Sequence, residues 1–124
     1  MAKYEFTVSA QPQFLAEQSD PDANQYVFAY TITVANTGEV TAQLISRHWI
    51  ITDAAGKVEE VKGEGVVGEQ PILRPGEAFR YTSGCPIETP VGSMRGSYQC
   101  VAEDGTRFDA AIPEFVLSMP RVLH

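Results

Sequence analysis

The run from Gly63 to Gly68 has the spacing G-x-G-x-x-G, which in dinucleotide-binding proteins lets the backbone approach a pyrophosphate. That fingerprint requires a strand before the first glycine and a helix after the last, because the helix N-terminus holds the phosphates. A strand is predicted before Gly63, but Pro71 and Pro75 would interrupt a helix after Gly68. We therefore expect an extended, glycine-bent loop, and a nucleotide or pyrophosphate site is the alternative.

A second candidate for chemistry is His48, which lies between Arg47 and Trp49 in a predicted strand and therefore on the opposite face from both. A base or metal ligand needs partners, and the other histidine is the last residue, His124. The serines lack the sequence around a nucleophile elbow. We expect His48 to be hydrogen-bonded within a sheet, with no catalytic residue in the chain, which is predicted not to be an enzyme. Trp49 shares its face with Ile51, which favours a core position.

Acidic residues gather in the middle of the chain and could in principle hold a cation. Glu59 and Glu60 are neighbours in a strand, so they point to opposite faces and cannot both reach one ion. We expect a solvated acidic rim and no metal site. The set consists of Asp53, Glu59, Glu60, Glu64 and Glu69.

Cys85 follows a glycine and precedes a proline, so it is predicted to lie in an accessible turn and to be structural. A disulfide with Cys100 is disfavoured, because residues 1–10 lack the apolar run of an export signal. The cytoplasm is the expected location, and thiols normally stay reduced there.

The charge balance limits the classes of partner. The 124 residues include 9 basic and 16 acidic ones, for a net charge of −7, and the basic residues are scattered. Nucleic acid is therefore not expected as a partner, since phosphate binding needs clustered cations. Membrane insertion is not expected either, because no apolar run is long enough to span a bilayer.

The elements that must position these residues are strands. Polar and apolar residues alternate with a period of two along most of the chain, and turn residues separate the alternating runs. This pattern predicts one all-β domain over residues 1–124, with an ordered core of about 4–117, folded as an antiparallel β-sandwich. The clearest runs are residues 4–10, 26–34, 40–51, 58–61, 79–82, 93–100 and 108–117.

Three smaller features refine this prediction. Short turns at residues 36–39 and 53–56 predict that three consecutive strands between Tyr26 and Val61 pair as antiparallel hairpins. Residues 13–18 are predicted to form one helical turn. Pro113 indicates an edge strand or a bulge in the last run.

Fixed residues along almost the whole chain resemble the signature of the ApaG domain family. They include residues 47–53, 63–71, 75–77, 81–84 and 89–90, together with Gly56, Val58, Val61, Leu73, Phe79, Gly92, Met94 and Gly96. The resemblance implies a fibronectin type III-like or immunoglobulin-like sandwich. It also implies a link to cobalt and magnesium homeostasis in bacteria, where members are also called CorD, and a role as an interaction module in related eukaryotic proteins.

The residues and the resemblance together favour a non-catalytic protein-interaction module. We expect any role in cobalt or magnesium homeostasis to be indirect, we expect no cofactor, and the protein partner is unidentified. The predicted partner surface consists of Gly63, Gly65, Gly68, Arg47, Trp49 and Tyr81.

Overall fold

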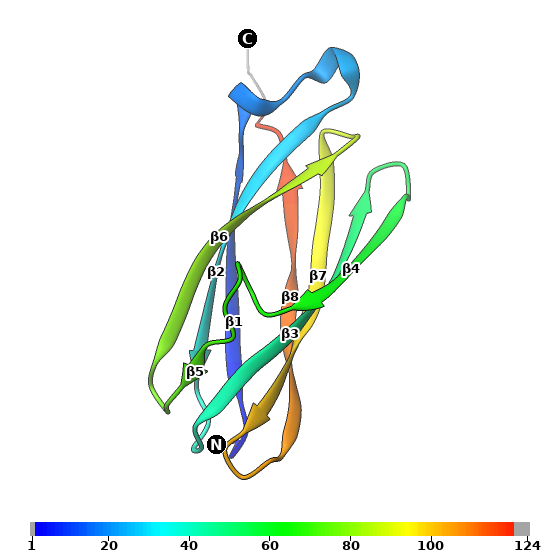
Figure 1. The fold of residues 1–124 in the computed structure, drawn as a ribbon. Coiled ribbons are helices and arrows are strands. Elements are labelled where there is room, and N and C mark those ends of the chain that lie inside the picture. Colours follow the sequence, from blue (N-terminus) through cyan, green and yellow to red (C-terminus); the bar gives the residue numbers. More distant parts are fainter. Residues whose placement is uncertain (1, 121–124) are drawn as a thin grey trace.

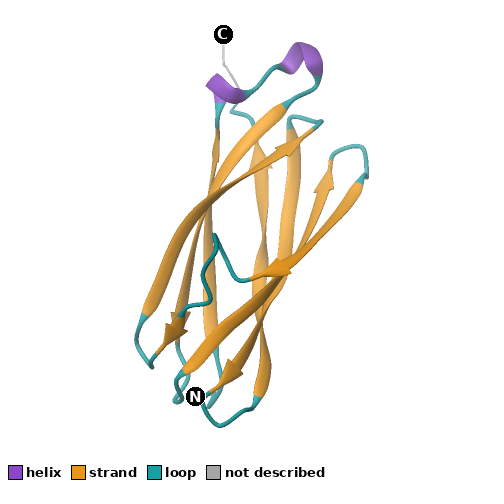
Figure 2. Cartoon of the chain, viewed as in Figure 1, coloured by secondary structure: helices purple, strands orange, loops and turns teal. Residues whose placement is uncertain are grey.

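The computed structural model describes residues 2–120, which form two antiparallel sheets packed face to face (Figures 1 and 2). The strands are β1 (Phe6–Phe14), β2 (Tyr26–Asn36), β3 (Ala42–Asp53), β4 (Val58–Glu64), β5 (Ile72–Leu73), β6 (Ala78–Ile87), β7 (Val91–Ala102) and β8 (Arg107–Ser118). One sheet has the order β1-β2-β6, and the other has the order β4-β3-β7-β8 with β5 also paired to β3. The predicted antiparallel β-sandwich is confirmed.

The two long sides of the sandwich differ. On one side, β1 and β8 are the edge strands of their sheets and contact each other. On the other side, β6 ends the first sheet and β4 ends the second. These two edges are joined at one end, where Lys57 Nζ and the Ala54 amide of the β3–β4 turn donate to Glu88 and Thr89, just after β6. The side of the sandwich between β4 and β6 is called the open side.

The predicted hairpin between residues 26–34 and 40–51 is wrong, because β2 and β3 belong to different sheets. The link between them is a corner organised by Asn36, a buried polar side chain. Its Nδ2 donates to the carbonyl oxygens of Val40 and Leu73, and its Oδ1 accepts from the Gly38 amide. A short glycine-containing turn permits a hairpin without requiring one. The second predicted hairpin, β3–β4, is confirmed by its register from Ser46–Glu64 to Thr52–Val58.

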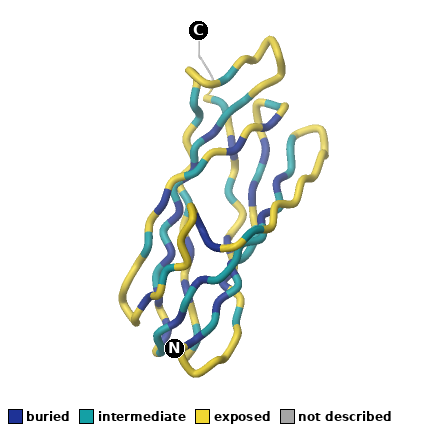
Figure 3. The backbone as a smooth tube through the Cα atoms, in the orientation of Figure 1, coloured by how far each residue is buried: buried dark blue, intermediate teal, exposed yellow. Residues whose placement is uncertain are grey.

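Alternating side chains of both sheets meet in one core. The backbone tube in Figure 3 shows buried residues in dark blue on strands of both sheets. Trp49 is 3% exposed, so its predicted core position is confirmed. Its indole packs edge-on against the rings of Tyr30, Tyr98 and Phe115, with centroids 5.2, 6.4 and 5.9 Å apart. Such edge-to-face aromatic pairs are favourable beyond the area they bury.

Local irregularities agree with the remaining predictions. The helical turn predicted within residues 13–18 is a 3₁₀ helix at Ala16–Gln18, and a second, unpredicted one follows at Pro21–Ala23. The β7–β8 register shifts between Met94–Phe115 and Gly96–Ile112. This places Pro113 at a bulge of an edge strand, as predicted, where its missing N–H costs no ladder bond.

Candidate functional site

A cleft lies on the open side, between the inner face of β4 and the strand β6. It consists of two adjoining cavities of about 260 and 350 Å³. Trp49 and Ile51 form its apolar base, and Val61 and Pro86 contribute from its two edges. The polar lining comes from Arg47, Tyr30, Ser83, Asp53, Lys57, Glu59 and Glu88.

The glycine loop, residues 63–68, borders this cleft along the edge of β3. The Gly65 amide donates to the Ile45 carbonyl oxygen at 2.7 Å, and Val66, which is 1% exposed, packs in the core. Val66 and Glu69 exchange two backbone hydrogen bonds of 2.8 and 2.9 Å, which closes a two-residue turn at Val67 and Gly68. Both turn residues have positive φ, +44° and +81°, as in a type I′ turn.

The prediction that no helix follows Gly68 is confirmed, because the chain turns back at Glu69 and continues to β5. The amides of Gly65, Val66 and Glu69 donate to backbone carbonyls of this chain. The geometry that a pyrophosphate needs, a helix N-terminus with free amides after the glycines, is therefore not formed at this loop.

Arg47 connects the glycine loop with the cleft. Its Nη1 donates to the carbonyl oxygens of Glu64 and Gly65, both at 2.9 Å, and its side chain lies in the cleft lining. The predicted proximity of Arg47 to Gly63 and Gly65 is therefore found in the structure. These two carbonyl acceptors place the half-buried guanidinium at the cleft wall.

Two members of the predicted partner surface need correction. Trp49 and Tyr81 are 3% and 8% exposed, so they pack in the core instead of lying on a surface. The Tyr81 hydroxyl pairs with that of Tyr98 at 2.5 Å. Burial raises the pKa of Tyr81 to about 12, although the hydrogen bond from Tyr98 opposes that rise. Tyr81 lies between the polar residues Arg80 and Thr82, so the period-two pattern indicates that its face of the strand is the buried one.

His48 lies on the outer face of β3, where its Nε2 is 2.9 Å from Oε1 of Glu60 on β4. The expected hydrogen bond within the sheet is confirmed. Glu59 points to the other face and lines the cleft, which confirms that the two neighbouring glutamates diverge. The other histidine, His124, lies outside the described residues.

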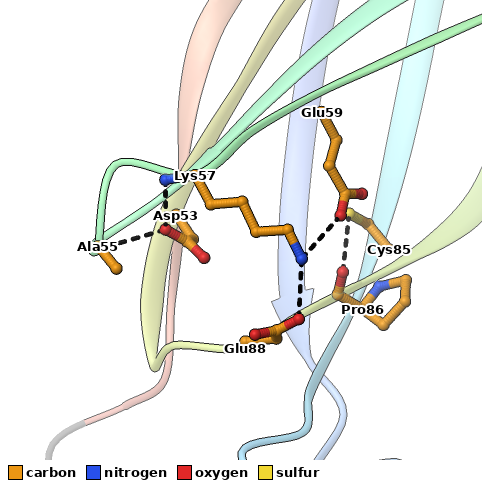
Figure 4. Close-up of polar contacts among 7 residues, drawn as sticks. All are labelled: Asp53, Ala55, Lys57, Glu59, Cys85, Pro86 and Glu88. Atoms are coloured by element: carbon orange, nitrogen blue, oxygen red, sulfur yellow. Dashed lines mark hydrogen bonds and ion pairs between the residues drawn. The ribbon is translucent and has the colours of Figure 1, made fainter.

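The acidic rim at the hairpin end of the cleft is built around Lys57 (Figure 4). The ammonium of Lys57 is 2.9 Å from Glu88 Oε1 and 3.4 Å from Glu59 Oε1. The Oδ1 atom of Asp53 accepts the amides of Ala55 and Lys57, which closes the β3–β4 turn. Glu59, Glu60, Glu64 and Glu69 are exposed, as expected of a solvated rim.

Cys85 is not in an accessible turn; it lies in β6 and is 4% exposed. Burial, and secondarily the charge of Glu59, raises the pKa of its thiol to about 11. Burial likewise raises the pKa of Cys100 to about 12, and neither cysteine is bonded to the other. High pKa values leave both thiols protonated and unreactive at neutral pH.

Two observations concern the described part of the chain as a whole. Residues 2–120 contain no group of three or more histidine, cysteine, aspartate or glutamate side chains arranged to hold a metal ion. They also contain no helix of the length and apolar character needed to cross a bilayer.

Sequence reasoning missed the cleft residues Ile51, Val61, Lys57 and Pro86. A weak signal was present in residues 58–64, where valines, glutamates and a lysine follow one another without clean alternation. Such a strand buries neither face well, which is typical of an edge strand. The partner across the cleft, β6, carried no comparable signal.

These features define an all-β sandwich domain with one closed side and one open side that carries a cleft. A family model described as the ApaG domain matches residues 16–102. This chain therefore belongs to the ApaG domain family, as the resemblance of its sequence to the family signature predicted.

Individual relatives extend the match over almost the whole chain. Protein ApaG of Thiobacillus denitrificans is 67% identical over 122 residues, which cover 98% of this chain and 96% of the relative. Protein ApaG of Ralstonia nicotianae is 64% identical over 124 residues and covers 100% of both chains. A crystal structure described as an ApaA protein from Bordetella pertussis has a TM-score of 0.94 and 59% identity, and the match covers 98% of each chain.

Proposed function

We propose that this protein is a non-catalytic interaction module that binds an extended segment of a partner protein along β4, with alternate side chains of that segment in the cleft. The observation that carries the proposal is the free edge of β4 beside an apolar-based cleft. Peptide addition to an exposed sheet edge is a recurrent mode of recognition, in which main-chain bonds give affinity and side-chain pockets give specificity.

The hydrogen-bonding groups of β4 support this mode. In an antiparallel ladder, alternate residues direct their N–H and C=O groups toward the neighbouring strand. At one end of the β3–β4 ladder the Asp53 amide donates to the Lys57 carbonyl, and at the other end the Gly65 amide donates to the Ile45 carbonyl. Between these two pairs, every second residue from Lys57 to Gly65 therefore directs its main-chain groups toward β3. The intervening residues of β4 therefore direct their main-chain groups away from β3. They are Val58, Glu60, Lys62 and Glu64.

The side chains of β4 favour a partner protein over a second copy of this chain. The strand carries three glutamates and one lysine, so two copies paired edge to edge would bring like charges together. The net charge of −7 adds to this repulsion. A segment with basic residues is complementary to the same edge.

The absence of catalysis is part of the proposal and is supported by where the reactive groups lie. Ser83 lines the cleft, whereas His48 is on the outer face of the other sheet and is bonded to Glu60. A general base must reach the nucleophile that it activates. We further place the module in the cytoplasm, because Cys85 and Cys100 are free thiols.

We propose that any role of this protein in cobalt or magnesium homeostasis is indirect, through the bound partner. Carboxylates near the cleft are engaged by Lys57 and by backbone amides instead of converging on one point. Calorimetry with cobalt and magnesium ions tests this part, and micromolar binding of either ion to the protein alone would contradict it.

The edge-binding proposal is tested by selecting short random peptides on the protein from a display library. Hydrogen exchange of the selected complex should show new protection at the Glu60 and Lys62 amides, while the Glu59 and Val61 amides are protected with or without peptide. Lys62→Pro removes one outward N–H without breaking the β3 ladder, and should abolish peptide binding. Lys62→Ala is the matched control and should bind.

Three results would contradict the proposal. The first is a library from which no binding peptide emerges. The second is protection that appears elsewhere, for example on β8 at the other edge of the sheet. The third is concentration-dependent dimerisation that protects the same β4 amides, which would assign this edge to a second copy of the chain.

A further inference from the structure

The charged groups along the cleft are separated into two ends. Arg47 lies at the end bordered by the glycine loop, and Glu59 and Glu88 lie at the end formed by the β3–β4 turn. This separation runs along the direction in which a peptide added to β4 would extend. It therefore bears on which peptides the cleft accepts.

Arg47 has capacity for an additional anionic group. Within residues 2–120, no carboxylate lies within 4.0 Å of its guanidinium, since the ion pairs of that region involve other cations. Its hydrogen bonds there are the two from Nη1 to backbone carbonyls. A guanidinium has five N–H donors, so those on Nε and Nη2 have no acceptor in the described part of the chain. A carboxylate is the planar acceptor that such a fork binds best.

The opposite end has an excess of negative charge. Glu59 and Glu88 share the single ammonium of Lys57, at 3.4 and 2.9 Å (Figure 4). Glu59 is opposite Ile51 in the β3–β4 ladder, and Ile51 is four residues from Arg47 along β3. Four residues of strand span about 13 Å. An even spacing also keeps both positions on the same face.

We propose, resting on the edge-binding function above, that the cleft selects an extended partner segment with an acidic residue beside Arg47 and a basic residue four positions away beside Glu59. Because the spacing is even, both side chains point into the cleft. The middle residue of the segment, two positions from each charge, points the same way and contacts Trp49 and Val61. The two charges also fix the direction of the segment, which main-chain hydrogen bonds alone do not. Charge complementarity of this kind contributes specificity more than affinity.

The test compares peptides selected on the wild-type protein with those selected on Arg47→Gln and on Glu59→Gln. Wild-type binders should be enriched in an acidic and a basic residue four apart. The acidic preference should disappear on Arg47→Gln and the basic one on Glu59→Gln. Replacing the acidic residue of one selected peptide with glutamine should weaken wild-type binding about tenfold. Against Arg47→Gln, the same replacement should change the dissociation constant by less than about twofold.

On each protein, the test uses the ratio of the dissociation constants of the glutamine peptide and the acidic peptide. Comparing this ratio between wild type and Arg47→Gln removes any effect of the variant on the loop. Arg47→Gln also loses the bonds to Glu64 and Gly65, but that loss weakens both peptides equally and cancels in the ratio. Peptides that bind at β4 without either charge preference, or with only one of them, would overturn this inference and leave edge binding intact. A protein that selects no peptide would remove edge binding and this inference together.

Discussion

Arg47 and Gly63 are directly opposite each other in the β3–β4 ladder, and the guanidinium of Arg47 lies against the glycine Cα. A Cβ at residue 63 would be 2.7 Å from Nη2 and 2.8 Å from Cζ of Arg47, closer than real contacts allow. The glycine therefore provides the space in which Arg47 reaches the Glu64 and Gly65 carbonyls. Gly63 supports a side-chain position, whereas phosphate approach is the role that its motif suggests.

Gly63→Ala should displace the guanidinium without unfolding the protein. The clash is with the end of a flexible side chain. We therefore expect the free energy of unfolding to fall by about 1 kcal/mol, from the loss of the two hydrogen bonds of Arg47. Gly65→Ala should cost about 3 kcal/mol or more, because its φ is +63° and its Cβ would overlap the Glu69 carbonyl oxygen. Urea denaturation of both variants measures the difference. Equal losses would contradict these separate roles.

Val67 is an unfavourable residue for its position, and replacing it should stabilise the fold. It has φ +44° at the first central position of the type I′ turn and is 57% exposed. A β-branched residue in the left-handed region costs roughly 1–2 kcal/mol, whereas Asn-Gly is the preferred pair for this turn. Val67→Asn should therefore raise the free energy of unfolding by about 1 kcal/mol and Tm by about 4 °C.

Val116→Asn is the control for Val67→Asn. Val116 is 55% exposed, like Val67, but it lies within strand β8. Asparagine has low strand propensity, so this change should leave stability unchanged or lower it by up to about 0.5 kcal/mol. A gain in both variants would attribute the effect to removal of exposed apolar surface. No gain at Val67 would show that the turn stores no strain.

The sequence was sufficient to predict the class of fold, because alternation reports which face of a strand is buried. It could not predict which strands pair, since β2 and β3 alternate equally well in one sheet or in two. The bulge between Leu44 and Ser46 was also missed. It explains how Leu44 and Trp49, an odd number of residues apart, are both buried.

The candidate site was harder to predict than the fold. Arg47 bonds to the glycine loop and lines the cleft beside Trp49. The cleft itself depends on how far β4 diverges from β6, which is a property of two strands more than ten residues apart in sequence. Local residue patterns contain no measure of that separation. Trp49 and Tyr81, which were assigned to the partner surface, lie beneath it in the core.

Stability should decline above about pH 9. Burial raises the pKa of Cys85 to about 11 from 9.0, and that of Cys100 to about 12. The unfolded chain therefore loses these protons at lower pH than the folded chain. The stability that the two protonated thiols contribute is fully present below their pKa in the unfolded chain, 9.0, and is lost as the pH rises through their folded pKa values. Tm measured at successive pH values should fall from about pH 9 to 12.

The variant Cys85→Ala/Cys100→Ala separates the thiols from the other groups. Burial also raises the pKa of Tyr81, from 10.0 to about 12, so this tyrosine still destabilises the fold at high pH. In the double variant the decline in Tm should begin near pH 10, about one unit later than in the wild type. A decline that still begins near pH 9 would show that the cysteines do not account for it.

The hydroxyl pair of Tyr81 and Tyr98 should behave as a coupled unit, because each hydroxyl is the buried partner of the other at 2.5 Å. Tyr98→Phe leaves the Tyr81 hydroxyl without its partner and should cost about 1–2 kcal/mol, and Tyr81→Phe should cost a similar amount. Removing both hydroxyls leaves no polar group unpaired. The double variant should therefore cost about 1 kcal/mol less than the sum of the single ones.

Thr31→Val is the control, because it breaks the exposed hydroxyl pair with Thr82, and it should change stability by no more than about 0.5 kcal/mol. Additive losses for the tyrosines, measured by urea denaturation of all four variants, would mean that water replaces the missing hydroxyl and that this part of the core is wet.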